Sequence, residues 1–143
     1  MKSTCCICGL TFEARHSYGL CPTHCNKDTL REFDRVESLA RYARRNNIYC
    51  SLTLIEWLST LSDFYGLCAF CKEYTANVIE RLVLPDGYTY FNVVPACKAC
   101  STMRRTSFER AVEQLAVYLD APRPVKLFRD IQEDMHADAE YDH

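Results

Sequence analysis

Long apolar runs are missing from this 143-residue sequence. It contains no stretch of about 18 apolar residues, so no membrane-spanning helix is predicted. Its first residues, MKSTCCICG, lack the apolar core of a secretory signal. We therefore expect a soluble, cytoplasmic protein without a membrane partner, and the length suits one compact core.

Cysteine, by contrast, is abundant, with ten residues in the chain. Several cysteines form C-x2-C pairs, the short spacing with which proteins hold tetrahedral zinc. A chain without an export signal is a poor candidate for a disulfide framework, so the spacing favours metal. We predict two structural Zn²⁺ ions, held by Cys5, Cys8, Cys21 and His24 (site 1) and by Cys68, Cys71, Cys97 and Cys100 (site 2).

The second half of site 1 has two interpretations. Cys21 and His24 form a C-x2-H pair at the expected start of a helix, whereas Cys21 and Cys25 form a C-x3-C pair in which Cys25 replaces His24. We favour His24, because its two-residue spacing repeats that of site 2. Cys6 and Cys50 are expected to be ordinary thiols.

The periodicity of apolar residues predicts an α+β protein. Steps of three and four residues predict one helix from about Asn26 to Asn46, and a second from Thr53 to Phe64 with a Thr53/Glu56 capping box. Between 75 and 91, β-branched and aromatic residues flank the Pro-Asp-Gly turn at 85–87, which predicts a hairpin. A further helix follows Cys100.

Four segments follow from this pattern. Residues 1–25 form an N-terminal zinc module, residues 26–66 contain the two helices, and residues 67–121 contain the second zinc unit. Residues 122–143 are expected to add one or two helical turns and then an acidic, partly disordered tail.

The stretch from Leu52 to Arg105 resembles the HNH endonuclease family. The resemblance is carried by GLCAFC at 66–71, the hairpin segment and NVVPACKAC at 92–100. It implies a treble-clef ββα core braced by zinc. In that family an Asp-His dipeptide on the first strand supplies a metal ligand and a general base for phosphodiester cleavage, and a central Asn orients the imidazole.

The sequence departs from this family at the catalytic positions. Glu80-Arg81 takes the place of the Asp-His pair, and no histidine lies between His24 and His136. Glu80 can coordinate Mg²⁺ or Mn²⁺, but the guanidinium of Arg81 stays protonated and cannot act as the base. Asn92 matches the central Asn. We expect a degenerate nuclease centre; the alternative is an active, divergent endonuclease that uses Glu80 and Asn92.

Charge is distributed unevenly along the chain. Residues 1–129 carry a net charge of +4 and residues 130–143 a net charge of −6. Two basic groups are candidates for contact with the phosphates of DNA or RNA, namely Lys98, Arg104, Arg105 and Arg110 on one side and Arg41, Arg44 and Arg45 on the other.

We therefore predict a zinc protein that binds nucleic acid without efficient cleavage, its acidic end competing with nucleic acid for the basic surface. The other alternative is a zinc-finger module that binds a protein partner. The sequence leaves the oligomeric state open.

Overall fold

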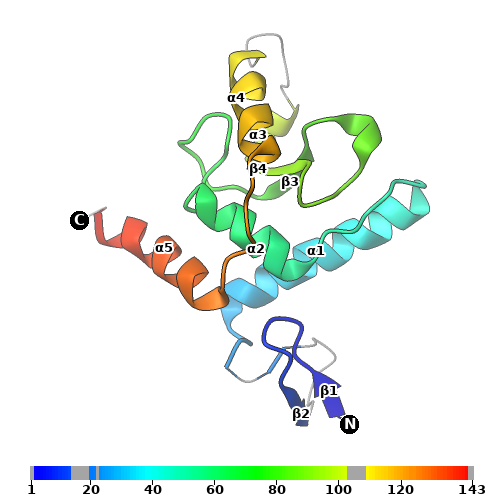
Figure 1. Cartoon of the computed structure of the whole chain (residues 1–143), viewed down its shortest axis with the longest axis vertical. Coiled ribbons are helices and arrows are strands. Elements are labelled where there is room, and N and C mark those ends of the chain that lie inside the picture. Colours follow the sequence, from blue (N-terminus) through cyan, green and yellow to red (C-terminus); the bar gives the residue numbers. More distant parts are fainter. Residues whose placement is uncertain (1, 14–19, 22, 103–108, 142–143) are drawn as a thin grey trace.

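The computed structural model describes residues 2–13, 20–21, 23–102 and 109–141, with side chains up to residue 135 in the last helix. Within these ranges the protein has mixed α and β structure (Figure 1). Its elements are β1 (Lys2–Thr4), β2 (Thr11–Glu13), α1 (Lys27–Arg45), α2 (Leu54–Asp63), β3 (Val78–Arg81), a 3-10 turn η1 (Leu84–Asp86), β4 (Val93–Ala96), α3 (Lys98–Thr102), α4 (Glu109–Asp120) and α5 (Phe128–Tyr141).

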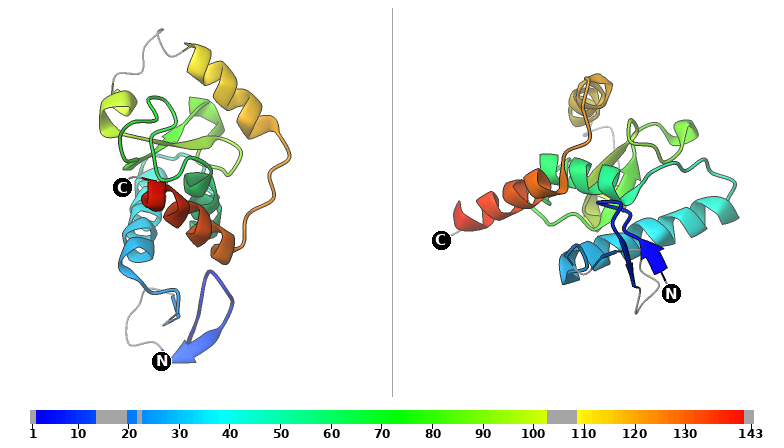
Figure 2. Two further views of the ribbon diagram at one scale, coloured as in Figure 1. Left: turned by 90° about the vertical axis from the view of Figure 1, so that its left-hand side faces the viewer. Right: turned by 60° about the horizontal axis from the view of Figure 1, so that its bottom comes forward.

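Helix α2 lies at the centre of the molecule and contacts α1, α5 and β4. The β1–β2 pair and α4 lie at opposite ends (Figures 1 and 2). The two predicted helices are confirmed, and the second has the predicted capping box. Asn26 Oδ1 accepts a hydrogen bond of 2.9 Å from the backbone N–H of Thr29, and Thr53 forms the capping box with Glu56. None of the described helices is long and apolar enough to cross a membrane.

A buried carboxylate joins α1 to α2. Glu32 is only 3% exposed, and the indole N–H of Trp57, which is fully buried, donates to its Oε1 over 3.0 Å. Arg35 donates to the same carboxylate over 2.6 Å. A buried charge is tolerated only when it is paired and hydrogen-bonded, and both conditions are met here.

The predicted hairpin is confirmed in its first strand and wrong in its second. β3 pairs antiparallel with β4, so Val78 faces Ala96 and Arg81 faces Val93. The expected second strand, before residue 92, is instead a loop that runs beside the α1–α2 connection, where Tyr88 N–H donates to Tyr49 C=O over 2.8 Å. Gly87 has a φ of +77°, and a Cβ there would lie 2.4 Å from the Tyr49 carbonyl oxygen. The turn at 85–87 therefore ends in a backbone contact that only glycine permits.

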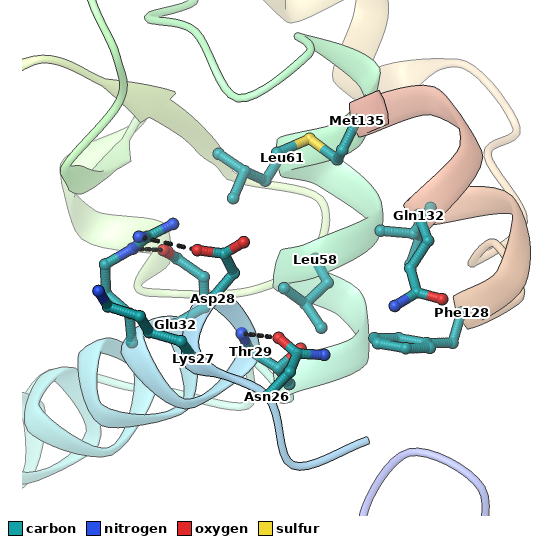
Figure 3. A pocket seen from close by; sticks show the side chains of 12 residues that line it. Asn26, Lys27, Asp28, Thr29, Glu32, Leu58, Leu61, Phe128, Gln132 and Met135 are labelled. Atoms are coloured by element: carbon teal, nitrogen blue, oxygen red, sulfur yellow. Dashed lines mark hydrogen bonds and ion pairs between the residues drawn. The ribbon is translucent and has the colours of Figure 1, made fainter. Parts of the chain in front are cut away.

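The last helix is also longer than predicted. In place of one or two helical turns, α5 spans 14 residues. Its apolar residues Phe128, Ile131 and Met135 recur at helical spacing and pack on Leu58 and Leu61 of α2 (Figure 3). Because Ile131 is 4% exposed, the start of the acidic segment belongs to the core. The predicted competition of the acidic residues with nucleic acid stays a prediction.

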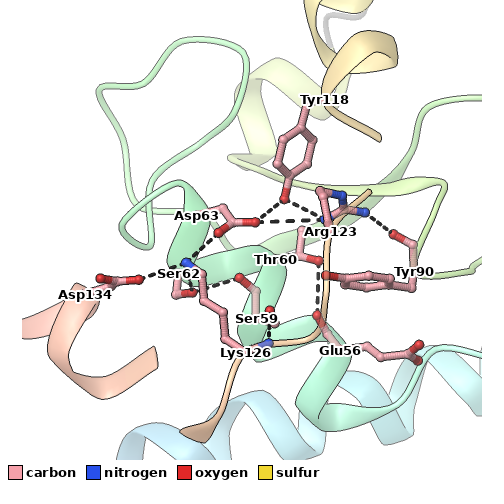
Figure 4. Close-up of polar contacts among 10 residues, drawn as sticks. All are labelled: Glu56, Ser59, Thr60, Ser62, Asp63, Tyr90, Tyr118, Arg123, Lys126 and Asp134. Carbon is pink, nitrogen blue, oxygen red and sulfur yellow. Dashed lines mark hydrogen bonds and ion pairs between the residues drawn. The ribbon is translucent and has the colours of Figure 1, made fainter. Parts of the chain in front are cut away.

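The connection between α4 and α5 is fastened by a stacked arginine. The Arg123 guanidinium lies between the rings of Tyr90 and Tyr118, 4.2 and 4.3 Å from their centroids. Arg123 also donates to the Tyr90 carbonyl over 2.7 Å and to the Tyr118 hydroxyl over 2.8 Å (Figure 4). Planar stacking and directed N–H donors together fix the course of this connection.

A lysine fastens the same connection to α2 and α5. Lys126 Nζ lies 2.5 Å from Asp63 Oδ1 and 2.8 Å from Asp134 Oδ2 (Figure 4). The Tyr118 hydroxyl donates to the other Asp63 oxygen over 2.5 Å. Asp63 thus links α4 and the α4–α5 connection to the end of α2, and Lys126 extends this link to α5.

Candidate metal centres and the α1–β3 cleft

Site 1 brings together the four residues predicted from the spacing. The ligand atoms of Cys5, Cys8, Cys21 and His24 all lie within 4.8 Å of one another. Cys5 and Cys8 come from the turn between β1 and β2, where the Gly9 N–H donates to the Cys5 carbonyl over 2.8 Å. The other two residues come from a turn just before α1, where the N–H of His24 donates to the Cys21 carbonyl over 3.0 Å.

His24, and not Cys25, completes this group. Its Nδ1 lies 3.3 Å from Cys21 Sγ and 3.5 Å from Cys5 Sγ. The Cys25 side chain packs against the hydrophobic core instead. The His24 ring also meets Phe128 of α5 edge-on, with centroids 4.6 Å apart. Site 1 therefore contacts both the start of α1 and the start of α5.

Site 2 brings together Cys68, Cys71, Cys97 and Cys100, again with all four sulfurs within 4.8 Å. The first pair lies in a tight turn after α2, where the Lys72 N–H donates to the Cys68 carbonyl over 2.9 Å. The second pair lies at the junction of β4 and α3, and the Cys100 N–H lies 3.4 Å from Cys97 Sγ. The four sulfurs of site 2 thus lie where the turn after α2, the β3–β4 pair and the start of α3 meet.

Both groups fit tetrahedral zinc. A Zn–S bond of about 2.3 Å places the sulfurs of a tetrahedron about 3.8 Å apart. The distances are 3.8 Å for Cys8–Cys21 and 3.9 Å for Cys71–Cys97. These separations exclude disulfides, whose S–S bond is about 2.05 Å, and all ten cysteines are free. Thiolate and imidazole are donors that zinc prefers. The two groups can each hold a metal ion.

The electrostatics of the thiols also suit a cation. Burial raises the pKa of Cys5, but backbone N–H groups of Cys21, Cys8 and Ile7 outweigh it and lower that pKa to about 6. At site 2, burial and hydrogen bonds with neighbouring thiols raise the pKa of Cys100. Four sulfurs so close together cannot all ionise unless a positive charge compensates them, as a bound divalent cation does.

The two candidate catalytic residues, Asn92 and Glu80, make different contacts in the structure. Asn92 is buried, and its carboxamide is occupied by backbone groups: Oδ1 accepts from the Val83 N–H over 2.9 Å, and Nδ2 donates to the Val83 and Gly87 carbonyls over 2.8 and 2.7 Å. Asn92 thus holds the 83–87 loop. Glu80 Oε2 accepts a hydrogen bond from the Ser101 hydroxyl, which ties β3 to α3.

Glu80 lines a cleft of about 360 Å³ between α1 and β3, which we call the α1–β3 cleft. Its lining contains two arginines, two tyrosines and two serines. The lining residues are Arg35, Ser38, Leu39 and Tyr42 of α1, Val78, Ile79, Glu80 and Arg81 of β3, and Tyr88 and Ser101. The Arg81 guanidinium lies over the Tyr88 ring, 4.7 Å from its centroid.

Helical spacing puts one member of each predicted basic group on the same helix face as a residue that lines this cleft. Arg45 follows Tyr42 by three residues, and Lys98 precedes Ser101 by three, so each shares a helix face with a lining residue. Lys98 and Arg45 are exposed. Arg44 follows Tyr42 by only two residues and lies on another face. Arg110 belongs to α4, a separate helix, and Arg104 and Arg105 lie outside the described residues.

A second pocket, of about 430 Å³, lies between the start of α1, α2 and α5 (Figure 3). Leu58, Leu61 and Ile131 form part of its apolar wall, whereas Asn26 and Glu32 lie at its polar side. The Asn26 side chain is occupied by the helix cap, and the Glu32 carboxylate by Trp57 and Arg35. These two polar groups are therefore engaged within the fold.

Sequence reasoning missed the cluster of Asp63, Tyr118, Arg123 and Lys126. These residues are distant along the chain, and no local spacing signals their meeting. The cluster resembles a catalytic constellation, since Lys126 Nζ lies 3.2 Å from Ser62 Oγ. However, burial alone would lower the pKa of Lys126, and its two carboxylate partners, Asp134 and Asp63, instead raise it. A lysine held in its charged form cannot act as a base, which argues against a general-base role for Lys126.

Comparisons with known proteins found no significant match. No protein-family model matches the chain, and no curated protein and no solved structure shows significant similarity to it.

Proposed function

We propose that this protein is a two-zinc scaffold that binds nucleic acid along the α1–β3 cleft without cleaving it. The proposal rests on helical spacing, because Arg45 of α1 and Lys98 of α3 each lie three residues from a residue that lines this cleft, and the lining itself includes Arg35 and Arg81. Positive groups from separate elements along one groove suit a phosphate backbone.

The aromatic content of the cleft supports the same proposal. Tyr42 is 44% exposed at the cleft, so its ring is accessible to a base. Stacking on tyrosine is independent of sequence and contributes roughly 1–3 kcal/mol per base. Serine hydroxyls at positions 38 and 101 add donors for phosphate oxygens. We propose a preference for single strands, whose bases are free to stack.

The order of elements supports a zinc-braced ββα core related to HNH endonucleases. β3, β4 and α3 follow one another, with one cysteine pair before β3 and the other at the β4–α3 junction. The cleft lies where β3 and α3 meet. Among the described residues, Glu80 is the one carboxylate that lines it, and none of the lining residues is a histidine. These observations favour binding over hydrolysis, which needs a general base beside the metal.

Binding is tested with fluorescently labelled single-stranded DNA, duplex DNA and single-stranded RNA of equal length, titrated at 50 and 200 mM salt. If the protein makes three phosphate contacts, the rise in salt from 50 to 200 mM should weaken duplex binding by about 40-fold, since the slope of log K against log salt is about −0.9 per contact. Parallel incubations with Mg²⁺ or Mn²⁺ should leave the nucleic acid intact. Absence of salt-dependent binding would favour a protein-interaction module.

Cleavage would point instead to the divergent nuclease. It would support that alternative only if it needs the divalent cation and is lost in Glu80→Ala. A matched control is Glu73→Ala, which removes an exposed carboxylate outside the cleft.

A further inference from the structure

Cys8 differs from the other candidate zinc ligands in its exposure. It is exposed, whereas the remaining seven ligand residues of the two sites, all of them described, are buried or half-buried. Oxidants react first with a thiolate that solvent can reach. Site 1 therefore presents a sulfur to solvent in a way that site 2 does not.

A partner sulfur lies next to Cys8. Cys21 Sγ is 3.8 Å away, and Cys21 is only 1% exposed, packed in the same core as Leu54 and Leu58. A disulfide of about 2.05 Å requires the two sulfurs to approach by less than about 2 Å. Cys8 lies in the turn between β1 and β2, so this turn can move while Cys21 stays fixed by the core.

We propose that Cys8 and Cys21 form a site of oxidative modification, at which a peroxide converts the metal-bound pair to a disulfide and site 1 releases its zinc. The Cys8 thiolate attacks hydrogen peroxide, a sulfur–oxygen bond forms, the O–O bond breaks, and the leaving hydroxide takes a proton to become water. The Cys21 thiolate then attacks the Cys8 sulfenic acid, the S–S bond forms, and the second hydroxide leaves as water. The two sulfurs lose two electrons, which the peroxide gains.

Loss of two thiolates leaves only Cys5 and His24 at site 1. Structural zinc needs four ligands, so the ion leaves. His24 then loses the bond that fixes its ring against Phe128, 4.6 Å away at the start of α5. Oxidation of site 1 therefore loosens α5 from α2, and this consequence does not depend on the proposed nucleic-acid function.

The test treats the zinc-loaded full-length protein with hydrogen peroxide. Released zinc is followed with a colorimetric chelator, cross-linked peptides are mapped by mass spectrometry, and hydrogen exchange is measured across α5. We expect one of the two zinc equivalents to be released, a Cys8–Cys21 cross-link, and faster exchange in residues 128–135. Simultaneous loss of both ions, earlier loss from site 2, or a principal cross-link through another cysteine would overturn the proposal.

Two variants sharpen this test. Cys8→His keeps a zinc ligand but removes the exposed thiol, so peroxide should release zinc from site 1 at least tenfold more slowly. Cys6→Ser removes the neighbouring exposed thiol and should react as the parent does. If Cys8→His does not bind two zinc ions, the peptide map of the parent and of Cys6→Ser decides the matter. A parent protein that binds no metal at site 1 would refute the proposal together with the site.

Discussion

The imidazole of His24 meets the ring of Phe128 edge-on, with centroids 4.6 Å apart, so a candidate zinc ligand touches the first residue of α5. Cys5 and Cys21 belong to the same hydrophobic core as Ile131 of that helix. Site 1 is therefore not an isolated module at the edge of the fold. A metal ion bound there would help to hold together the start of α1 and the start of α5.

This contact predicts that a change in α5 affects metal binding. Phe128→Ala should destabilise the fold by about 1–3 kcal/mol, below the full cost of a buried Phe→Ala change because the side chain is half-buried. The variant should also lower the zinc affinity of site 1 and leave the zinc affinity of site 2 unchanged, as measured by competition with a chelator. Leu127→Ala is the matched control, since Leu127 is 63% exposed and should change stability by no more than about 0.5 kcal/mol. Equal zinc affinities in parent and Phe128→Ala would contradict the coupling.

Asn92 is predicted to stabilise the fold and not to take part in catalysis. Asn92→Ala leaves the Val83 N–H and the Val83 and Gly87 carbonyls without their side-chain partner, which should cost about 2–3 kcal/mol in the free energy of unfolding. Urea denaturation measures this loss, and exposed Asn77→Ala should be close to the parent. Nucleic-acid binding per folded molecule should not change. A folded, fully stable Asn92→Ala protein with altered activity would refute this role.

The cleft predicts different effects for two adjacent arginines. Arg45 shares a helix face with Tyr42, whereas Arg44 lies on another face. Arg45→Glu should weaken nucleic-acid binding by about tenfold at low salt and reduce the salt slope by about one contact. Arg44→Glu makes the same charge change and should have an effect of less than about threefold. Anisotropy titrations of both variants decide this; equal losses would show that only net charge matters.

The Asp63 cluster predicts a loss of stability at alkaline pH. Burial and the Asp63 carboxylate raise the pKa of Tyr118 above its usual 10.0, and the Asp134 and Asp63 carboxylates outweigh burial to raise that of Lys126 above 10.5. For both groups the folded state holds its proton more tightly than the unfolded state, so their contribution is complete below about pH 10 and is lost as pH rises further.

Urea denaturation of the parent and of a Tyr118→Phe/Lys126→Met variant from pH 8 to 11.5 measures this. The difference in stability between the two proteins should shrink above pH 10. A constant difference would contradict the assignment.

The grouping of the candidate ligands could be predicted because ligand spacing is local. Two residues between ligands fix a knuckle whatever the rest of the chain does, so both groups were identified from spacing alone. The choice of His24 over Cys25 also followed from spacing. The capping box of α2 was predicted for the same reason, since Thr53 and Glu56 are only three residues apart.

Elements defined by distant contacts were predicted less well. The second strand of the hairpin was misplaced because the backbone of Tyr88 bonds to Tyr49 and Ser51, which are far from β3 in sequence. Most of α5 was missed because its many acids suggested disorder. The spacing of Phe128, Ile131 and Met135 was the signal that could have identified it, since these residues cover the face of α2.

The central claim is that two zinc ions hold this protein together, and the most direct test combines metal analysis with X-ray absorption at the zinc edge on protein purified under reducing conditions. The account predicts two zinc ions per chain, and a coordination of seven sulfurs and one nitrogen shared between them, from the four residues of each site. Fewer than two zinc ions per chain, or oxygen among the ligands in place of sulfur, would contradict it.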